Sequence, residues 1–384
     1  MGARHDVVVI GLGAMGAAAL YQLAKRGARV LGIDRYDPPH DRGSSHGDTR
    51  ITRLAIGEGA HYTPMVMRSH EIWRAIEAET GADLLTQCGG LVISSHTRTS
   101  FTHVPEFFDN TVAAARRHGI AHELLDTAAL RARFSQFAVR DGEFGYYEPD
   151  AGFVRPEACI AAQLELARRH GAEIRTGETV LGFDADATVT TEQGRYSADT
   201  AIVAAGAWLP RLLGGRLARP FKVYRQVLAW FDAGDAAGAF APGRFPVFIW
   251  ELQDSRQGIY GFPALDGAGV KVATEQYGQA TSADSVRRAV APQETGAMFE
   301  AYVAPQFPKL GARCTRSAVC LYTVTPDFQF VIDRHPGMAN VIVASPCSGH
   351  GFKHSAAIGE ALAQLALEGR SDFDLSPFGF ARFQ

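Results

Sequence analysis

A glycine-rich turn near the N-terminus constrains this chain most. An expected strand, 6–10, runs into Gly11-Leu12-Gly13-Ala14-Met15-Gly16, which opens an expected helix. Gly11 permits a tight turn, Gly13 lets the backbone approach a pyrophosphate, and Gly16 lets the helix pack closely against a sheet. A second strand, 29–33, ends on Asp34, whose carboxylate can accept hydrogen bonds from a ribose. Together these features predict an adenine-dinucleotide site.

The identity of the dinucleotide follows from both ends of the chain. The acid at residue 34 disfavours a 2′-phosphate and therefore NADP, whereas NAD and FAD both remain. Near the C-terminus, an apolar strand, 340–344, leads into Ser348-Gly349-His350-Gly351-Phe352-Lys353 and a further helix. Such a helix N-terminus can return to the cofactor and stabilise negative charge on a reduced flavin. This layout favours FAD over NAD.

The chain has 384 residues, a length typical of two domains. Along it, segments typical of parallel strands alternate with segments typical of antiparallel strands. The apolar run 201–205 is typical of a buried parallel strand, whereas 227–231 and 269–273 favour antiparallel strands. We expect an α/β fold in which a Rossmann-like FAD-binding domain is interleaved with an α+β substrate domain on a mostly antiparallel sheet. The expected ranges are 1–88, 148–218 and 325–384 for the FAD-binding domain, and 89–147 and 219–324 for the substrate domain.

Composition argues against several other classes of protein. Hydrophobic residues make up 46% of the chain and charged residues 21%, which suits a globular enzyme. The formal net charge of −3, without a long basic run, gives no electrostatic footprint for nucleic acid. No apolar stretch approaches the roughly 20 residues that span a bilayer, and we expect no membrane association. The five cysteines are irregularly spaced, so we expect no disulfide framework, no metal site and a cytoplasmic location.

Several motifs resemble one enzyme family over nearly the whole chain. They are Pro38-Pro39-His40, Gly43–Arg53, Gly57-Glu58-Gly59, Ala318–Thr323 and Ser348–Lys353. These segments resemble monomeric sarcosine oxidase and N-methyltryptophan oxidase, and the ending 371–378 with Arg382-Phe383-Gln384 is most similar to the N-methyltryptophan branch. The resemblance implies a monomeric FAD-dependent oxidase of secondary (N-methyl or N-alkyl) amino acids. Hydride would pass to the flavin, the imine would hydrolyse to aldehyde plus amine, and O2 would reoxidise the flavin to give hydrogen peroxide.

Other readings remain open at this point. The same fold serves a dehydrogenase that passes electrons to a carrier, or an oxidase of sugar-modified or cyclic amino acids. An NAD-dependent dehydrogenase and a catalytically silent flavin-binding regulator are further alternatives. The expected substrate is a small secondary amine that carries a carboxylate, with O2 as the second partner.

Cys320 matches the family cysteine that holds the flavin covalently. A thiolate is a suitable nucleophile for the flavin methyl carbon, whereas the local alternative is a buried cysteine that packs as a small hydrophobic residue. Cys347, beside the C-terminal turn, is a second attachment point in reserve. The other expected cofactor-binding residues come from the two glycine turns and the segments near them: Gly11, Gly13, Ala14, Met15, Gly16, Asp34, Arg35, Ser44, Ser45, Thr49, Arg50, Val180, Gly206, Gly349, His350, Gly351, Phe352 and Lys353.

Four residues match catalytic positions of the family. Lys271 alternates with Val270 and Val272 on an expected strand, and the resemblance implies that its cation lies over the flavin and stabilises a superoxide-like state. Without the resemblance, a solvated strand lysine is the simpler interpretation. Arg50 matches a residue that stabilises negative charge on the flavin, and His46 one that assists attachment or proton movement. Tyr260 matches an aromatic residue at the substrate amine.

The expected substrate site combines aromatic walls with two cationic residues that bind a carboxylate. Arg53 offers a planar fork and Lys353 a point charge, and the pair matches family residues that bind the substrate carboxylate. Tyr322 matches a second aromatic residue beside the amine.

Two residues depart from the family pattern within this expected substrate site. Glu275 stands where a histidine is usual, and Trp250 where a smaller residue is usual. A carboxylate and a large wall would make sarcosine a poor substrate and a bulkier N-alkyl amino acid a better one. Pairing of Glu275 with a nearby base is the alternative.

Overall fold

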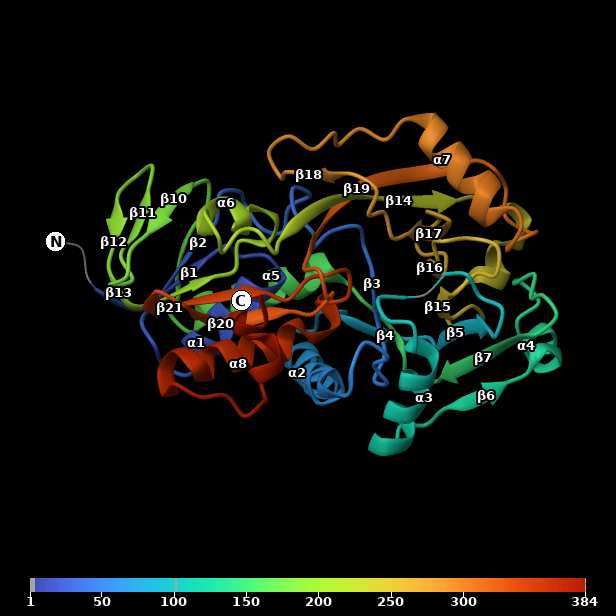
Figure 1. Ribbon diagram of the computed structural model, residues 1–384, viewed down its shortest axis with the longest axis horizontal. Coiled ribbons are helices and arrows are strands. Elements are labelled where there is room, and N and C mark those ends of the chain that lie inside the picture. The colour runs from blue at the N-terminus through green and yellow to red at the C-terminus, as the bar shows by residue number, and fades with distance from the viewer. Residues whose placement is uncertain (1–3, 101, 384) are drawn as a thin grey trace.

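The expected N-terminal strand, β1 (His5–Ile10), lies inside a mainly parallel sheet in the left half of Figure 1. The structure, a computed structural model, describes residues 4–100 and 102–383. Within those residues the sheet has six strands in the order β20-β21-β13-β1-β2-β9, and only β20 runs antiparallel to its neighbour. The other strands are β2 (Val30–Ile33), β9 (Glu173–Arg175), β13 (Ala198–Val203), β20 (Val331–His335) and β21 (Met338–Ser345).

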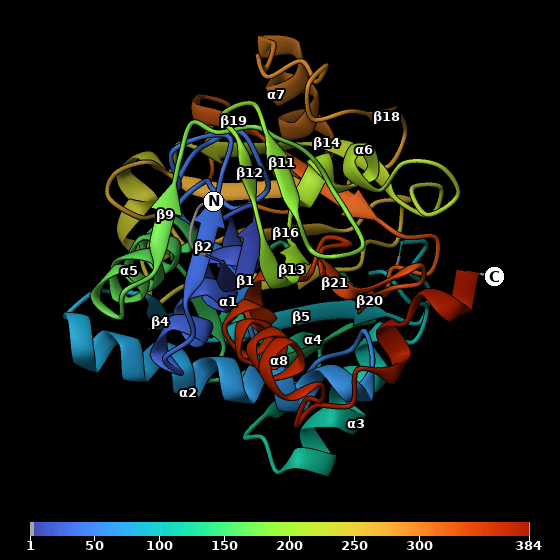
Figure 2. The ribbon, with the colours of Figure 1, turned by 90° about the vertical axis from the view of Figure 1, so that its left-hand side faces the viewer.

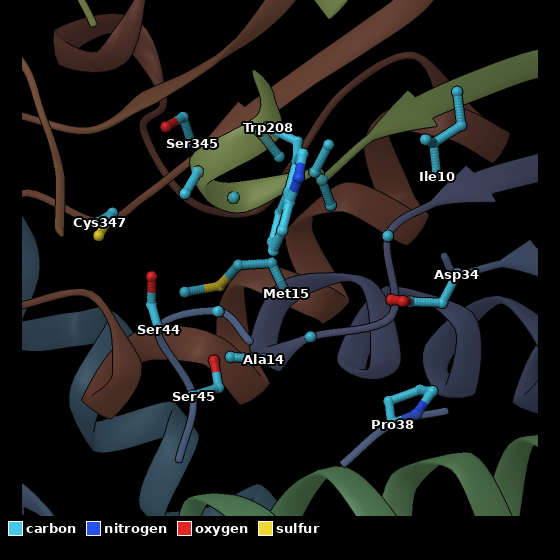
Figure 3. Close-up of a pocket in the computed structure, with 18 of the residues that line it drawn as sticks. Ile10, Ala14, Met15, Asp34, Pro38, Ser44, Ser45, Trp208, Ser345 and Cys347 are labelled. Atoms are coloured by element: carbon cyan, nitrogen blue, oxygen red, sulfur yellow. The ribbon is translucent and has the colours of Figure 1, made fainter. Parts of the chain in front are cut away.

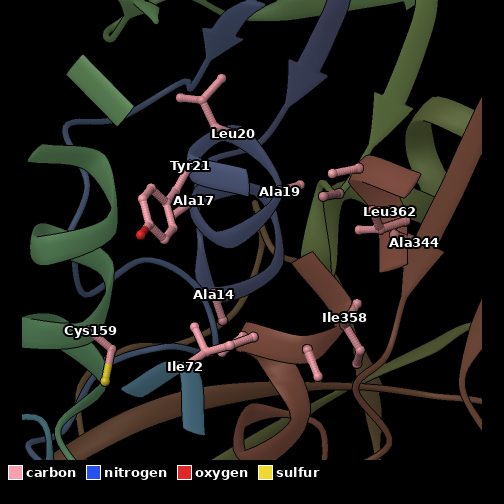
Figure 4. Packing of buried hydrophobic residues seen from close by; sticks show 14 of the residues in the cluster. Ala14, Ala17, Ala19, Leu20, Tyr21, Ile72, Cys159, Ala344, Ile358 and Leu362 are labelled. Atoms are coloured by element: carbon pink, nitrogen blue, oxygen red, sulfur yellow. The ribbon is translucent and has the colours of Figure 1, made fainter. Parts of the chain in front are cut away.

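The two faces of this sheet are covered differently, because successive side chains of a strand point to opposite faces. Val7 and Val9 pack among helices, whereas Val8 and Ile10 pack towards a small antiparallel sheet. Figure 4 shows the helical side, where Leu20, Tyr21, Ile72, Ile358 and Leu362 come together around α1. The helices on this face are α1 (Ala14–Lys25), α2 (Thr63–Thr80), α5 (Pro156–Arg169) and α8 (Ser355–Glu368). The small sheet consists of β10 (Val180–Phe183), β11 (Val189–Thr191) and β12 (Arg195–Tyr196), and Figure 2 shows it on the far side of the sheet from α1 and α8.

A second large sheet occupies the right half of Figure 1. In the described residues it has nine strands, and its neighbours run antiparallel except for the parallel pair β5–β15. This mixture confirms the expected α/β fold with a mostly antiparallel second sheet. The strands are β5 (Gly90–Ser95), β6 (Glu123–Leu125), β7 (Glu143–Glu148), β14 (Lys222–Phe231), β15 (Val247–Trp250), β16 (Ile259–Phe262), β17 (Val270–Thr274), β18 (Ala280–Thr281) and β19 (Cys314–Val324).

Smaller elements join the two large sheets. A third antiparallel sheet contains β3 (Arg50–Thr52), β4 (Leu85–Gln87) and β8 (Gly152–Val154). The remaining α-helices are α3 (Phe107–His118), α4 (Thr127–Arg133), α6 (Leu209–Leu213) and α7 (Pro292–Met298). None of the helices in the described part of the chain combines the length and the apolar character that crossing a membrane requires.

The origin of each sheet in the sequence supports a division into two interleaved domains. The six-stranded sheet draws on 5–33, 173–203 and 331–345, and the nine-stranded sheet on 90–148 and 222–324. We therefore propose the expected domain ranges as the division of the chain, although β7 continues to Glu148, one residue past the expected boundary. Residues 1–3, 101 and 384 of those ranges lie outside the described residues.

Candidate active site

An elongated cavity opens at the carboxyl ends of the parallel strands, where open α/β sheets bind their ligands (Figure 3). It reaches from Asp34 and Pro38 at one end to Ser345 and Cys347 at the other. Most of the expected cofactor-binding residues line it: Gly11, Gly13, Ala14, Met15, Asp34, Arg35, Ser44, Ser45, Arg50, Val180, Gly206, Gly349, Gly351 and Phe352.

The N-terminal glycine turn has the geometry that its sequence predicts. Gly11 has a φ of +86°, and a Cβ there would lie 2.7 Å from the carbonyl oxygen of Ala204. A Cβ on Gly16 would lie 1.7 Å from the carbonyl oxygen of Gly11. Gly16 therefore packs α1 against the turn and, among the described lining residues, has no place in the cavity wall.

Asp34 is held by backbone donors at the edge of the cavity. Its Oδ2 accepts a hydrogen bond from the backbone N–H of Leu12 at 2.7 Å, and its Oδ1 accepts one from Tyr36 at 2.8 Å. Helix α1 begins at Ala14 and carries no acidic residue in its first turn, so its N-terminus keeps a partial positive charge. An acid for a ribose and a helix N-terminus for phosphates fit a dinucleotide.

A second cavity adjoins the first and shares four of its lining residues: Arg50, Tyr322, Gly349 and Phe352. Its walls include Lys271 of β17, Tyr260 of β16 and Glu275 just beyond β17. Thr49, His350 and Lys353 were expected to bind the cofactor, but in the structure they line this second cavity rather than the first. The reason is that the two turns bearing them separate the cavities, so neighbouring side chains face opposite sides.

Arg53 and Lys353, the expected carboxylate-binding pair, meet at a buried acid. Arg53 Nη2 lies 2.6 Å and Lys353 Nζ 3.5 Å from the carboxylate of Glu58. Burial raises the pKa of Glu58, but the charges of Arg53 and Lys353 outweigh burial and hold this pKa well below its ordinary value. Burial lowers the pKa of Lys353 to about 8. Sequence analysis assigns no role to Glu58, although this residue lies in the Gly57-Glu58-Gly59 motif that contributes to the family resemblance.

A second buried acid holds the backbone beside Arg53. Glu148, at the end of β7, accepts hydrogen bonds from the backbone N–H groups of Leu54 and Ala55 at 2.5 and 3.1 Å. The hydroxyl of Tyr146 donates to the same carboxylate at 2.9 Å. Glu148 thus positions the segment that carries Arg53, and no local sequence pattern marks this function.

Glu275 is paired with a base, as the alternative interpretation of the sequence allows. Its Oε1 lies 2.9 Å from Nε2 of His103, a residue of the segment between β5 and α3. Burial lowers the pKa of His103, but the carboxylates of Glu275 and Glu58 together outweigh burial and raise this pKa to about 9. His103 is therefore a cation near neutral pH, and the negative charge of Glu275 is compensated. This pairing removes the premise that Glu275 repels small carboxylates such as sarcosine.

Trp250 does not line the second cavity, which corrects the expectation that it forms a wall of the substrate site. It is 1% exposed, packs against Phe137 and Phe307, and donates a hydrogen bond from Nε1 to Glu143 Oε1 at 3.0 Å. Its neighbour Ile249 lines the cavity instead. Alternation along β15 sends the two side chains to opposite faces of the sheet.

Lys271 points into the second cavity, on the opposite face from Val270 and Val272. The two valines belong to a core cluster, and Nζ of Lys271 donates to the carbonyl oxygens of Gly47 and Thr49, both at 2.8 Å. Burial lowers the pKa of Lys271 well below its ordinary value, and the positive charge of Arg50 acts in the same direction.

Cys320 lies behind the wall between the cavities, beside Arg50. Its Sγ is 3.3 Å from the carbonyl oxygen of Ser44 and 3.5 Å from Nη2 of Arg50. His46 is also buried, and burial, followed by Arg50, lowers its pKa to about 4, so its imidazole is neutral near neutral pH. Neither Cys320 nor His46 is among the described residues that line the two cavities.

Two tyrosines form one wall of the second cavity. The hydroxyl groups of Tyr260 and Tyr322 lie 3.0 Å apart, within hydrogen-bonding distance. Burial raises the pKa of both residues far above neutrality, so both hydroxyls stay protonated.

In the described residues we find no group of three or more His, Cys, Asp or Glu side chains arranged to hold a metal ion.

Comparisons with known proteins agree with this geometry. A model of the FAD dependent oxidoreductase family matches residues 6–365. The monomeric sarcosine oxidase of Bacillus sp. (strain NS-129) is 39% identical over 388 residues, which cover 100% of this chain and 98% of the relative. The N-methyl-L-tryptophan oxidase of Salmonella arizonae is 35% identical and covers 99% of each chain.

The solved structures show the same fold at lower identity. NikD, described as an unusual amino acid oxidase essential for nikkomycin biosynthesis, has a TM-score of 0.82 at 24% identity and covers 98% of each chain. The L-proline dehydrogenase of P. horikoshii has a TM-score of 0.81 at 20% identity and covers 100% of this chain and 98% of that one.

Over the whole chain the identity is 39% to the sarcosine oxidase and 35% to the N-methyl-L-tryptophan oxidase. The similarity of the ending 371–384 to the N-methyltryptophan branch stays a prediction, and Gln384 lies outside the described residues. The chain belongs to the FAD-dependent oxidoreductases, in the group that contains the monomeric sarcosine oxidases and the N-methyl-L-tryptophan oxidases.

Proposed function

We propose that this FAD-dependent oxidoreductase acts on the CH–NH bond of a small secondary amino acid, N-methyl or N-alkyl, with O2 as the acceptor. The observation that carries the proposal is the placement of Arg53 and Lys353 in one cavity with Tyr260, Tyr322 and Lys271, next to the cavity that fits a dinucleotide. FAD supplies the redox chemistry when bound, since it accepts a hydride equivalent from the amine and passes electrons to O2.

The substrate carboxylate binds between Arg53 and Lys353. Nη1 of Arg53 donates a hydrogen bond to the carbonyl oxygen of Ala55, and Nη2 donates one to the carboxylate of Glu58. The buried Nε of Arg53 has no hydrogen-bond partner among the described residues. Lys353 donates to the carbonyl oxygen of His350 at 2.8 Å, which leaves further N–H donors. An ammonium has three donors, and a guanidinium has five, so both can bind an anion as well as their present partners.

The amine binds in its neutral form beside the two tyrosines. The cations Arg53 and Lys353 disfavour a second positive charge nearby, because like charges repel in a buried site. The hydroxyls of Tyr260 and Tyr322, which stay protonated, can accept or donate one hydrogen bond each but cannot act as bases near neutral pH. No general base is required, and the imine product leaves to hydrolyse to aldehyde plus amine.

Lys271 serves the reaction with oxygen in this proposal. Its two carbonyl contacts and the ring of Phe262, 3.9 Å from Nζ, hold the side chain in one position. A fixed donor in a buried cavity stabilises developing negative charge without reorganisation. Arg50 lines both cavities and offers a positive charge, whereas His46 is buried behind the lining residues with a neutral imidazole.

Covalent attachment of FAD through Cys320 is part of the same proposal. Nη2 of Arg50 lies 3.5 Å from Sγ, where it contacts the sulfur that would form the bond. The position of Cys320 beside Ser44 and Arg50, which line the first cavity, supports attachment at the border of the two cavities. The sarcosine oxidase relatives are named as monomeric enzymes, which supports a monomer here as well.

A peroxide assay over a panel of amines tests the proposal. The panel contains sarcosine, N-methyltryptophan, pipecolate, proline and a fructosyl amino acid, each in air with the purified yellow enzyme. We expect hydrogen peroxide with at least one N-methyl amino acid. Flavin bleaching without peroxide would instead identify a dehydrogenase that uses an electron carrier, and no bleaching with any amine would reject the proposal.

A further inference from the structure

We propose that His103 is a third cation of the substrate cavity, and that it cancels the charge of Glu275 so that the cavity accepts one carboxylate and an uncharged side chain. The inference rests on the proposed function, because it specifies which secondary amino acids the same cavity takes. It concerns His103 and Glu275, whose roles follow neither from the sequence motifs nor from the carboxylate-binding residues Arg53 and Lys353.

His103 reaches into the cavity from a segment that other contacts already fix. Ser100 and Thr102 are held by hydrogen bonds to Leu252 and Glu251, on the loop after β15. His103 itself has a φ of +60°, which is uncommon for a residue with a side chain and turns it away from the path of the loop. Its ring is 4% exposed and lines the cavity with Thr102. The loop therefore does not depend on His103 alone for its position.

The ring of His103 lies between two carboxylates. Nε2 is 2.9 Å from Glu275, and Nδ1 is 3.7 Å from Glu58. The ring of His350 lies 5.0 Å away, and burial lowers the pKa of His350 well below its ordinary value, so His350 is neutral. An imidazolium between two acids is stabilised by both of them. The positive charge of His103 compensates the negative charge of Glu275, so Glu275 does not repel an anion bound in the cavity.

The charges around Glu58 leave one positive charge in excess. Arg53, Lys353 and His103 supply three cations, and Glu58 and Glu275 supply two carboxylates. One substrate carboxylate neutralises this cluster, whereas a second carboxylate or a cationic side chain unbalances it. Lys271 and Arg50 line the same cavity but contact Gly47, Thr49, Ser44 and Cys320 at its other side.

Charge-balancing substitutions test this inference on the oxidised holoenzyme without turnover. The probe is (methylthio)acetate, which keeps the shape of sarcosine and its carboxylate, and its Kd is read from the change in flavin absorbance. We expect H103Q to weaken binding about tenfold, because one nearby cation is lost. E275Q should bind at least as tightly as the wild type. The double variant H103Q/E275Q should return to within about threefold of the wild type, because the excess of one positive charge is restored.

Two controls separate charge from folding. H96Q changes an exposed histidine of the same segment, whose ring packs 4.9 Å from that of Phe144, and should leave Kd unchanged. The uncharged amide of the probe should bind H103Q and wild type alike. A double variant that binds the carboxylate as weakly as H103Q would overturn the inference, since a structural role of His103 predicts no rescue.

A substrate comparison gives the second readout. Wild-type enzyme should prefer N-methylalanine to N-methylaspartate by kcat/KM, and E275Q should narrow this preference about tenfold. An unchanged preference in E275Q would also overturn the inference. Failure of the wild type to oxidise any secondary amino acid would reject the proposed function instead, so the two failures are distinct.

Discussion

The two cavities meet at one wall but are built in different ways. In the first, a glycine turn, a helix N-terminus and backbone N–H groups that hold Asp34 provide the contacts. In the second, buried charged side chains from separate segments neutralise one another, and Arg53, Glu58 and Lys353 are the central group. A backbone cradle tolerates many side-chain changes, whereas each charged side chain of a mutually compensated cluster has its own measurable effect. Substitutions along the shared wall and in the second cavity therefore test the comparison most directly.

The largest expected effect is at the wall itself. Replacing Cys320 by Ser should abolish covalent attachment, because a hydroxyl is a far weaker nucleophile than a thiolate. Acid-precipitated wild-type protein should stay yellow, and the colour should move to the supernatant for C320S. C347S is the matched control: Cys347 lines the first cavity, but attachment is proposed at Cys320, so the C347S pellet should stay yellow. A colourless wild-type pellet would contradict attachment at either cysteine.

Lys271 comes next in expected size. Lys271→Met should slow reoxidation of the flavin by O2 about 10²- to 10³-fold, the usual loss for one preorganised donor, and should slow reduction by substrate much less. Stopped-flow measurement of the two half-reactions gives both rates. Lys222→Met, at an exposed position of β14, is the control and should change neither. Equal losses in both half-reactions would assign Lys271 a general structural role.

Arg53 should have an intermediate effect. Arg53→Ala should weaken binding of (methylthio)acetate by about 1.5–3 kcal/mol, as expected for a lost charge-assisted hydrogen bond. Arg53→Lys keeps the charge without the planar fork and should lose less. Arg313→Ala, an exposed arginine paired with Asp232, serves as the control. Unchanged binding in both Arg53→Ala and Lys353→Ala would locate the carboxylate elsewhere.

The pH dependence of binding should reveal the second cavity's cations. Lys353 has a pKa of about 8 and His103 of about 9, so both are positive at pH 7 and lose their charge as pH rises through these values. The Kd of (methylthio)acetate should be constant between pH 6 and 7 and rise above pH 8. In Lys353→Met the earlier step should disappear. A flat profile up to pH 10 would show that these cations do not bind the anion.

The smallest effect on activity is expected at Trp250. Trp250→Phe leaves the buried Glu143 without the indole donor and should lower the free energy of unfolding by about 1–3 kcal/mol. The KM for substrate should stay the same, because Trp250 faces the core. Ile249→Ala, on the cavity side of the same strand, should change KM instead. A changed KM in Trp250→Phe with normal stability would place the indole at the substrate after all.

The difference between the cavities also explains what the sequence predicts. The glycine turn, Asp34 and the parallel strands lie in continuous segments with fixed spacing, and the expected helices and strands there match α1, α8, β1 and β21. His103 and Glu148 have no such spacing, because they meet Glu275 and the Arg53 segment only through folding. Trp250 was misplaced for a related reason, since a strand pattern gives alternation but not which face meets the cavity.

Strand β19 fixes the spacing between two residues of the site. Cys320 and Tyr322 lie two residues apart on it, so their side chains project from the same face at a separation of about 6.6 Å. Pairing with β14, which matches Gln226 to Cys320 and Tyr224 to Tyr322, holds that interval. If the flavin is tethered at Cys320, the distance from the tether to the substrate wall is a property of one strand. A single residue inserted between the two positions would turn one of them to the opposite face and uncouple cofactor from substrate.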